Sequence, residues 1–392
     1  MRRIGLLGVV AAALVVAATA AARTSAGTPI VIGWAHDSTG PMAPFDGPAL
    51  AAAQIRVAQI NAKGGVDGHP LVIKTCDTQG DNAAVSKSCA DKLIAEHVNV
   101  IFTTCDVDLA APVVQESINA GLLTIAPCIG TDQMGPKRFG AKGALAFSFG
   151  NVAQDEGSAM AQFAWAKGWR KADLATDTVI VYFKNVVQAF AARWKQLGGK
   201  IVDQESYQDP AFHGNNVQNA VSRINAHPAD VIVTATAGAY QALAPMITGL
   251  RTLGNNTPVL NSWAGDGTYW LPKSPKVSNY YFVTYADAFG GDPNPAINAL
   301  AKKIHAATGG FVTGPAAIDG LATAIREAGG STNGAALAAK MVKFHDVPTL
   351  SGLVSFSPQL HSVYHRQYRV IEIQNNVPKL VAEVVAKVVP KI

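Results

Sequence analysis

The sequence predicts an α/β protein made of two similar lobes, each with a parallel β-sheet core. Short apolar, β-branched runs alternate with helical segments along most of the chain. This alternation is typical of parallel sheets that are covered by helices on both faces. The length of 392 residues is too great for one ordinary domain and suits two.

The first half of the chain contains four apolar strands that alternate with three helices. Strands are expected at residues 29–34, 71–75, 98–104 and 122–126, and helices at 49–61, 82–96 and 110–120. In the second of these helices, Val85, Cys89 and Leu93 recur on one face. Open α/β sheets bind ligands outside the carboxyl ends of their strands, so a site is expected there.

A second α/β unit follows. Strands are expected at 172–176, 200–202, 230–236, 257–260 and 280–283, and helices at 186–197, 217–226, 241–253, 295–307, 315–328 and 334–344. The chain ends differently, because residues 368–373 and 377–381 flank an Asn-rich turn and predict a β-hairpin. Two such lobes facing each other would place a ligand site between them.

Composition and charge exclude several classes of protein. Hydrophobic residues make up 49% of the chain and charged residues 15%, which excludes a disordered protein. The formal charge of +5 is small and no long Lys/Arg run occurs, which argues against a nucleic-acid partner.

The first 22 residues resemble a Sec signal peptide. A positive start at Arg2 and Arg3 precedes the uncharged run 4–18, and small residues 20–22 provide a cleavage site. Loss of this segment removes two of the 32 basic residues and lowers the net charge from +5 to +3. The mature chain is expected in the periplasm, and an uncleaved anchor is the alternative.

Four cysteines in an exported chain predict two disulfides. The pairing Cys76–Cys89 with Cys105–Cys128 is favoured, because Cys105 and Cys128 each follow an apolar run expected to form neighbouring strands. Pairing of Cys76 with Cys105 remains an alternative. No C-x-x-C motif supports a zinc site.

Sequence motifs of enzymes are missing. No G-x-G-x-x-G follows the first strand, and the chain contains no P-loop, H-E-x-x-H or G-x-S-x-G motif. No catalytic residue, cofactor or metal is therefore expected. His361 and His365 are interpreted as a solvated surface pair.

Residues 60–74, INAKGGVDGHPLVIK, carry a family resemblance. They resemble a helix, Gly-Gly turn and strand of the leucine/isoleucine/valine-type (type I) periplasmic binding proteins of ABC transporters. Residues 38–47, 121–127 and 349–381 continue the resemblance in order. It implies a Venus-flytrap fold of two Rossmann-like lobes joined by a three-stranded hinge. The expected limits are 28–147 with 285–351 for lobe 1, and 148–284 with 352–392 for lobe 2.

The resemblance also implies site residues in the first lobe. Phe45 matches an aromatic residue that touches the ligand. Two loops match segments that bind a ligand carboxylate through hydroxyl and N–H groups. These loops contain Thr104, Cys105, Asp106, Val107 and Asp108, and Ile129 and Thr131. Val107 replaces the usual Ser.

The second lobe is expected to contribute aromatic and acidic residues. Asp177 is expected to end a strand, which makes Tyr182 the ligand-facing aromatic residue, followed by Phe183 in place of the usual Gly. Tyr240 is a further candidate. Trp263 or Asp266 lies where the family places an acidic residue for a ligand ammonium group.

Asp106 and Asp108 depart from the family pattern, because two carboxylates would repel a ligand carboxylate. One interpretation is that both cap the following helix. The other is that they hold a cationic or hydrogen-bond-donating group of the ligand.

The expected function is extracytoplasmic capture of an amino acid or amino-acid-like compound for an ABC permease. An amide or aromatic acid is the alternative ligand, and an exported ligand-sensing receptor or an exported enzyme is the alternative function. The expected partners are the small-molecule ligand and membrane permease subunits, and the chain is expected to be a monomer.

Overall fold

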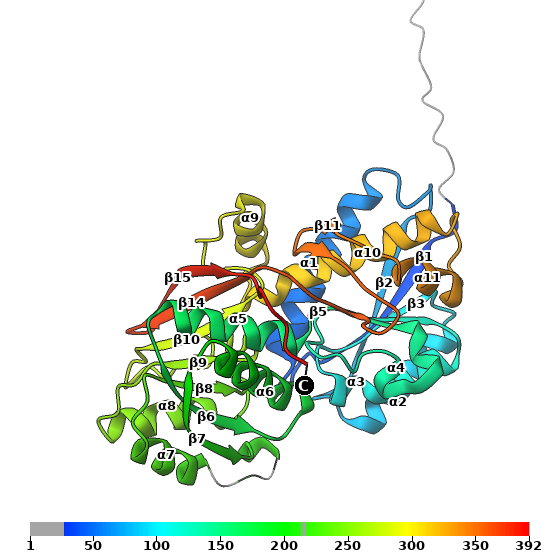
Figure 1. The fold of residues 1–392 in the computed structure, drawn as a ribbon. Coiled ribbons are helices and arrows are strands. Elements are labelled where there is room, and N and C mark those ends of the chain that lie inside the picture. The colour runs from blue at the N-terminus through cyan, green and yellow to red at the C-terminus, as the bar shows by residue number, and fades with distance from the viewer. Residues whose placement is uncertain (1–26, 213, 215–216, 392) are drawn as a thin grey trace, which may run out of the picture.

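The computed structural model describes residues 27–212, 214 and 217–391. Two α/β lobes lie side by side, each built on its own sheet (Figure 1). The predicted α/β class with parallel-sheet cores is confirmed. The predicted signal peptide, 1–22, lies outside the described residues. Among the described residues, no helix is both long and apolar enough to cross a membrane.

The first sheet has six parallel strands in the order β13-β5-β4-β3-β1-β2. They are β1 (Ile30–His36), β2 (Leu71–Asp77), β3 (Val100–Phe102), β4 (Leu123–Ala126), β5 (Ala146–Asn151) and β13 (Ser362–Val363). One face packs against α1 (Ala43–Asn61), α10 (Thr313–Glu327) and α11 (Gly334–Met341), and the other against α2 (Ala83–Ala95) and α3 (Val107–Asn119). Both faces are covered, which explains the continuous apolar strands.

The second sheet has seven strands in the order β15-β14-β10-β9-β8-β6-β7. They are β6 (Lys171–Asp177), β7 (Lys200–Tyr207), β8 (Val231–Ala235), β9 (Val259–Asn261), β10 (Tyr280–Thr284), β14 (Tyr368–Gln374) and β15 (Val377–Val384). Helices α5 (Ala153–Ala166) and α6 (Val181–Gln196) cover one face, and α7 (Val217–Ala226) and α8 (Leu243–Thr252) the other. The hairpin β14–β15 was predicted, and its turn residues Asn375 and Asn376 both have positive φ, as a tight two-residue turn requires.

The remaining α-helices and strands of the described residues lie at the edges of the lobes. They are the helices α4 (Pro136–Phe139) and α9 (Pro295–Ile304), and a small antiparallel pair, β11 (Val347–Thr349) and β12 (Gly352–Val354). The C-terminal tail runs back over α5, where Ser158 Oγ donates to the carbonyl of Val388 and Gln162 Nε2 donates to that of Val385.

The chain passes between the two sheets three times. It crosses after β5, after β10, and between β13 and β14. The limits expected from the sequence place residues 148–151 and 352–392 in the second lobe. In the structure β5 extends to Asn151 in the first sheet, and β13 pairs with β5 there. A strand of two residues has no readable period, so the sequence pattern does not reveal β13.

Side chains from all three crossovers meet. Asn151 Nδ2 donates to the hydroxyl of Tyr368 at 2.6 Å, and the Asn151 N–H donates to that of Tyr285 at 3.2 Å. The buried guanidinium of Arg366 lies 5.0 Å from the Tyr285 ring centre and donates to the carbonyl of Phe149. These contacts connect the three hinge segments directly beside a cavity between the lobes.

Candidate functional site

A small cavity of ≈ 20 Å³, enough for about one water molecule, lies between the lobes. It is lined by Met42, Phe45, Cys105 and Asp106 from the first lobe and by Ile180, Tyr182, Phe183, Ala237, Tyr240, Trp263 and Ala264 from the second. Every lining segment follows the carboxyl end of a parallel strand: β1, β3, β6, β8 or β9. Open α/β sheets bind ligands at this edge.

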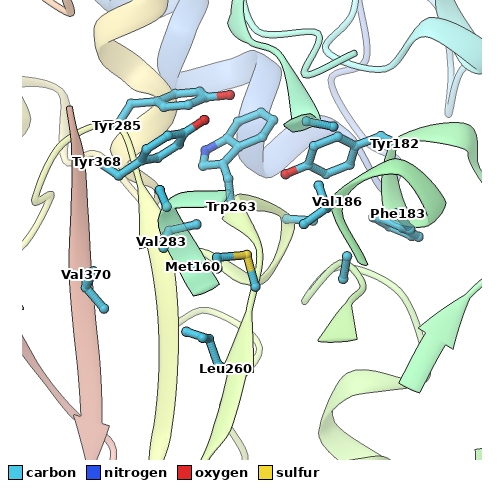
Figure 2. Close-up of a cluster of buried hydrophobic side chains, with 14 of the residues drawn as sticks. Met160, Tyr182, Phe183, Val186, Leu260, Trp263, Val283, Tyr285, Tyr368 and Val370 are labelled. Atoms are coloured by element: carbon cyan, nitrogen blue, oxygen red, sulfur yellow. The ribbon is translucent and has the colours of Figure 1, made fainter. Parts of the chain in front are cut away.

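Aromatic rings from both lobes surround the cavity. The Phe45 ring centre lies 4.9 Å from that of Trp263, which lies 6.5 Å from that of Tyr182. The ring of Phe183 lies between those of Tyr182 and Tyr240. Its centre is 5.8 Å from the Tyr182 ring centre and 6.1 Å from the Tyr240 ring centre. Figure 2 shows Trp263 between Tyr182 and the hinge residue Tyr285, on which it stacks at 5.1 Å. The cavity wall is therefore continuous with the hinge.

Glu156 on α5 fixes two of these aromatic residues. Its Oε1 accepts a hydrogen bond from the Tyr182 hydroxyl at 2.7 Å and one from the backbone N–H of Trp263 at 2.6 Å. Burial raises the pKa of Glu156 to about 7, because the charged form has lost its water. Sequence reasoning missed this residue, since the segment that forms α5 was not predicted as a helix.

Tyr182 packs closely against the first lobe. A Cβ added at Gly130 would lie 2.7 Å from the Tyr182 ring, which is closer than nonbonded carbon atoms approach. Gly130 follows β4 in the first lobe and Tyr182 starts α6 in the second. A glycine at this position allows the two lobes to approach each other.

Asp106 caps α3 and also faces the cavity. Its side chain accepts the N–H groups of Asp108 and Leu109, and its backbone is extended as an N-cap requires. Burial, and secondarily the charge of Asp108, raise the pKa of Asp106 to about 7. The capping interpretation is therefore correct for Asp106.

Asp108 has another role. It lies in the first turn of α3, where Oδ1 pairs with Arg138 Nη1 at 2.5 Å. Its Oδ2 accepts the N–H of Val181 at 2.8 Å, at the start of α6 in the other lobe. Asp108 thus connects the lobes at the cavity rim and does not line the cavity.

Half of the residues expected from the sequence line the cavity. These are Phe45, Cys105, Asp106, Tyr182, Tyr240 and Trp263. The others, Thr104, Val107, Asp108, Ile129, Thr131 and Asp266, do not. Val107 and Ile129 are buried in an apolar cluster. Thr104 donates to Asp81, and Asp266 accepts the Thr284 hydroxyl and the Gly309 N–H.

Five lining residues were not predicted. They are Met42, Ile180, Phe183, Ala237 and Ala264. All five lie within three residues of a predicted site residue. Their position shortly after the end of a strand is the sequence feature that could have identified them. Apolar residues in a loop carry no chemical signature of their own.

Two disulfides join the predicted cysteines. Cys76 pairs with Cys89 and Cys105 with Cys128, at Cα separations of 5.6 and 4.8 Å. The favoured pairing is confirmed, and the alternative of Cys76 with Cys105 is wrong. The Cys105–Cys128 bond joins the loops after β3 and β4, at the edge of the cavity.

Outside the cavity, three carboxylates lie close together in the second lobe. Ligand atoms of Asp173, Asp203 and Glu205 lie within 4.8 Å of one another. Arg223 already pairs with Asp203 at 3.2 Å and with Glu205 at 3.4 Å, so a cation of the chain itself faces this group. The expectation of no metal or cofactor stays a prediction.

Two facing α/β lobes joined by three crossovers around an interlobe cavity define a two-lobed Venus-flytrap architecture. The model of the periplasmic binding protein family matches residues 29–377, so the chain belongs to that family. Members of this family and the solved neighbours are substrate-binding proteins, and membership implies an extracytoplasmic location.

Individual relatives are distant. The chain is 24% identical to the Leu/Ile/Val-binding protein BraC3 of Rhizobium johnstonii over 336 residues, which cover 83% of this chain and 87% of the relative. It resembles the LivJ structure from Streptococcus pneumoniae in complex with isoleucine, with a TM-score of 0.75 and 20% identity. The match covers 91% of this chain and 99% of LivJ. It also resembles a solute-binding protein of R. palustris in complex with 4-hydroxybenzoate, with a TM-score of 0.74 and 18% identity. That match covers 92% of this chain and 95% of the neighbour.

Proposed function

We propose that this protein captures a small organic molecule in the interlobe cavity and delivers it to the membrane permease of an ABC transporter. The observation that carries the proposal is the cavity itself, which is lined by both lobes at the carboxyl ends of both sheets. The proposal involves no catalysis. The lining cysteine, Cys105, is in a disulfide and is not a free nucleophile.

Closure of the two lobes is the proposed mechanism. The ligand binds first to one lobe, and rotation about the three crossovers then buries it. A ligand favours the closed state only through contacts that both lobes make together. Phe45 of the first lobe and Tyr182 and Trp263 of the second are proposed to supply these contacts.

The proposed ligand is an amino acid or an amino-acid-like compound. The curated relative is named for leucine, isoleucine and valine, whereas one structural neighbour holds 4-hydroxybenzoate. An amide or an aromatic acid is therefore the alternative ligand, and ligand sensing is the alternative role. The protein is proposed to be exported by a signal peptide at 1–22 and to act as a periplasmic monomer.

A thermal-shift screen of the purified chain beginning at residue 23 tests the proposal. The panel contains amino acids, amides, aromatic acids and amines. A ligand at 100 times its dissociation constant stabilises the folded state by about 2.7 kcal/mol, which is visible as a shift in melting temperature. A concentration-dependent shift with one class supports the proposal, and no shift with any class contradicts it.

A further inference from the structure

Three N–H groups beside the cavity in the first lobe already have partners within the chain. Asp106 Oδ1 accepts the N–H groups of Asp108 at 2.8 Å and Leu109 at 3.2 Å, at the start of α3. The N–H of Cys105 donates to Asp46 Oδ1 at 3.0 Å. Unpaired N–H groups at a helix start attract anions, and these groups are paired.

One N–H group of the second lobe beside the cavity is also paired. The N–H of Val181 at the start of α6 donates to Asp108 Oδ2. The ring of Tyr182 covers Gly130 in the loop 128–131. Of Val181, Gly130 and Tyr182, Tyr182 is the one that lines the cavity.

The cavity lining carries one carboxyl group and no cationic side chain. Among the described residues, those that line the cavity include one carboxylate, Asp106, and no Lys, Arg or His. Asp106 is only 4% exposed. A ligand carboxylate would lie beside Asp106 in a space shielded from water, where repulsion between like charges is strong. The lining therefore disfavours an anionic ligand.

The aromatic rings favour the opposite charge. A cation over the face of an aromatic ring, within about 6 Å of its centre, is attracted by the ring, and the attraction is stronger without water. Rings of Phe45, Tyr182, Phe183, Tyr240 and Trp263 surround the cavity. The buried Tyr240 hydroxyl has no hydrogen-bond partner among the described residues and can bond to a ligand.

We infer, on the basis of the proposed capture of a small organic molecule, that the ligand is an amino-acid-like compound that has the ammonium group and lacks the carboxylate. Its ammonium group lies against Asp106, and its hydrocarbon part lies between Phe45, Tyr182 and Trp263. The lobes must separate to admit this ligand, because the ≈ 20 Å³ between them in this structure is far below the ~300–1,000 Å³ typical of ligand pockets.

Matched ligands that differ only in charged groups test this inference by calorimetric titration. The pairs are leucine with 3-methylbutylamine, and phenylalanine with 2-phenylethylamine. The acids 3-methylbutanoate and 4-hydroxybenzoate complete the set. We expect at least one amine to bind 10-fold or more tightly than its amino acid and than either acid.

The outcomes separate the inference from the proposed function. Tighter binding of an amino acid or an acid would overturn the inference and leave the proposed function standing. If no amine binds, the inference fails. If no compound of the wider thermal-shift panel binds either, the proposed function fails as well.

A charge-neutral variant locates the ammonium group. Asp106→Asn keeps an N-cap side chain, so α3 is retained while the charge is lost. We expect a loss of amine affinity of at least 10-fold with little change in melting temperature. Asp91→Asn, an exposed position on α2, is the matched control and should bind like the wild type. Unchanged amine affinity in Asp106→Asn would overturn the inference.

Discussion

A single buried carboxylate arranges much of the second-lobe wall of the cavity. Glu156 accepts hydrogen bonds from the Tyr182 hydroxyl and from the Trp263 backbone N–H. Both rings are therefore positioned before a ligand arrives. Groups that are fixed in advance lose less conformational entropy on binding. The cavity-lining rings could be predicted because they follow the carboxyl ends of strands and match positions of the family pattern. Glu156 could not, since nothing in its local sequence separates it from an exposed helix residue.

Gly130→Ala should weaken ligand binding by opposing closure of the lobes. The added methyl group would lie 2.7 Å from the Tyr182 ring in the closed state and has no such neighbour once the lobes separate. We expect a loss of affinity of 10-fold or more for the compound identified by the thermal-shift screen, measured by calorimetry. Gly47→Ala is the control, because nothing lies within 4 Å of its added Cβ. Equal affinity of the two variants would contradict the expected closure.

The histidine pair shows where residue-level prediction failed. His361 and His365 were interpreted as solvated, yet His361 is 4% exposed and stacks on Phe147 with ring centres 4.1 Å apart. Its ring also bonds to the Ala146 carbonyl. His365 is exposed, as expected. The prediction for His361 was wrong because the short strand β13, which buries it, has no sequence signature.

At the scale of elements, strong apolar periodicity predicted most of the fold. The strands of both sheets other than β5 and β13 were expected within a few residues of their observed positions. The exceptions have physical causes. Small residues dominate α5, where Ala, Gly and Ser allow close packing against α6 and leave no amphipathic pattern. The strand β5 contains alternating aromatic and small residues, and it leads directly into a crossover.

The disulfide between β2 and α2 should be important for stability. Cys76 and Cys89 are separated by 13 residues, and closing a loop of that size stabilises a fold by about 3 kcal/mol through the unfolded state. We expect the double variant Cys76→Ser with Cys89→Ser to lose about 2–4 kcal/mol of unfolding free energy in urea. Its ligand affinity should be retained, because neither cysteine lines the cavity. A change below 1 kcal/mol would contradict this prediction.

At the scale of the whole molecule, Asp108 connects the two lobes. Because its Oδ2 accepts the Val181 N–H across the cleft, Asp108→Ala should destabilise the closed state by about 1 kcal/mol, the value of one hydrogen bond. We expect a loss of ligand affinity of about 5-fold in calorimetric titration. Arg138→Ala removes the partner of Asp108 within the first lobe and should have a smaller effect. Unchanged affinity in Asp108→Ala would indicate that this contact forms independently of ligand binding.

Buried carboxyl groups should make the protein less stable as the pH rises from about 5 to 8. Burial raises the pKa of Glu156, Asp177 and Asp266 to about 7. Between pH ~4.5 and ~7, the folded chain keeps protons on these groups that the unfolded chain has already released. Raising the pH through this range therefore lowers the free energy of unfolding. Carboxyl groups with lowered pKa values, such as Asp77, change stability only at lower pH.

Urea unfolding at pH 5.5 and 7.5 checks the direction of this dependence. Unfolding free energy should be higher at pH 5.5. Glu156→Gln, which keeps an acceptor for Tyr182, should reduce the difference by about 2 kcal/mol, since one pKa unit corresponds to ~1.4 kcal/mol. Greater stability at pH 7.5 would show that these carboxyl groups are ionised at no cost in the folded chain.

Hydrogen exchange measured with and without the compound that gives the largest thermal shift tests the central claim most directly. If the ligand is held between the lobes, amide exchange should slow in both lobes together. The segments are residues 103–109 in the first lobe and 180–187 and 262–266 in the second, all next to the cavity. Slower exchange confined to one lobe, or to a surface away from the cavity, would contradict capture of the ligand between two closing lobes.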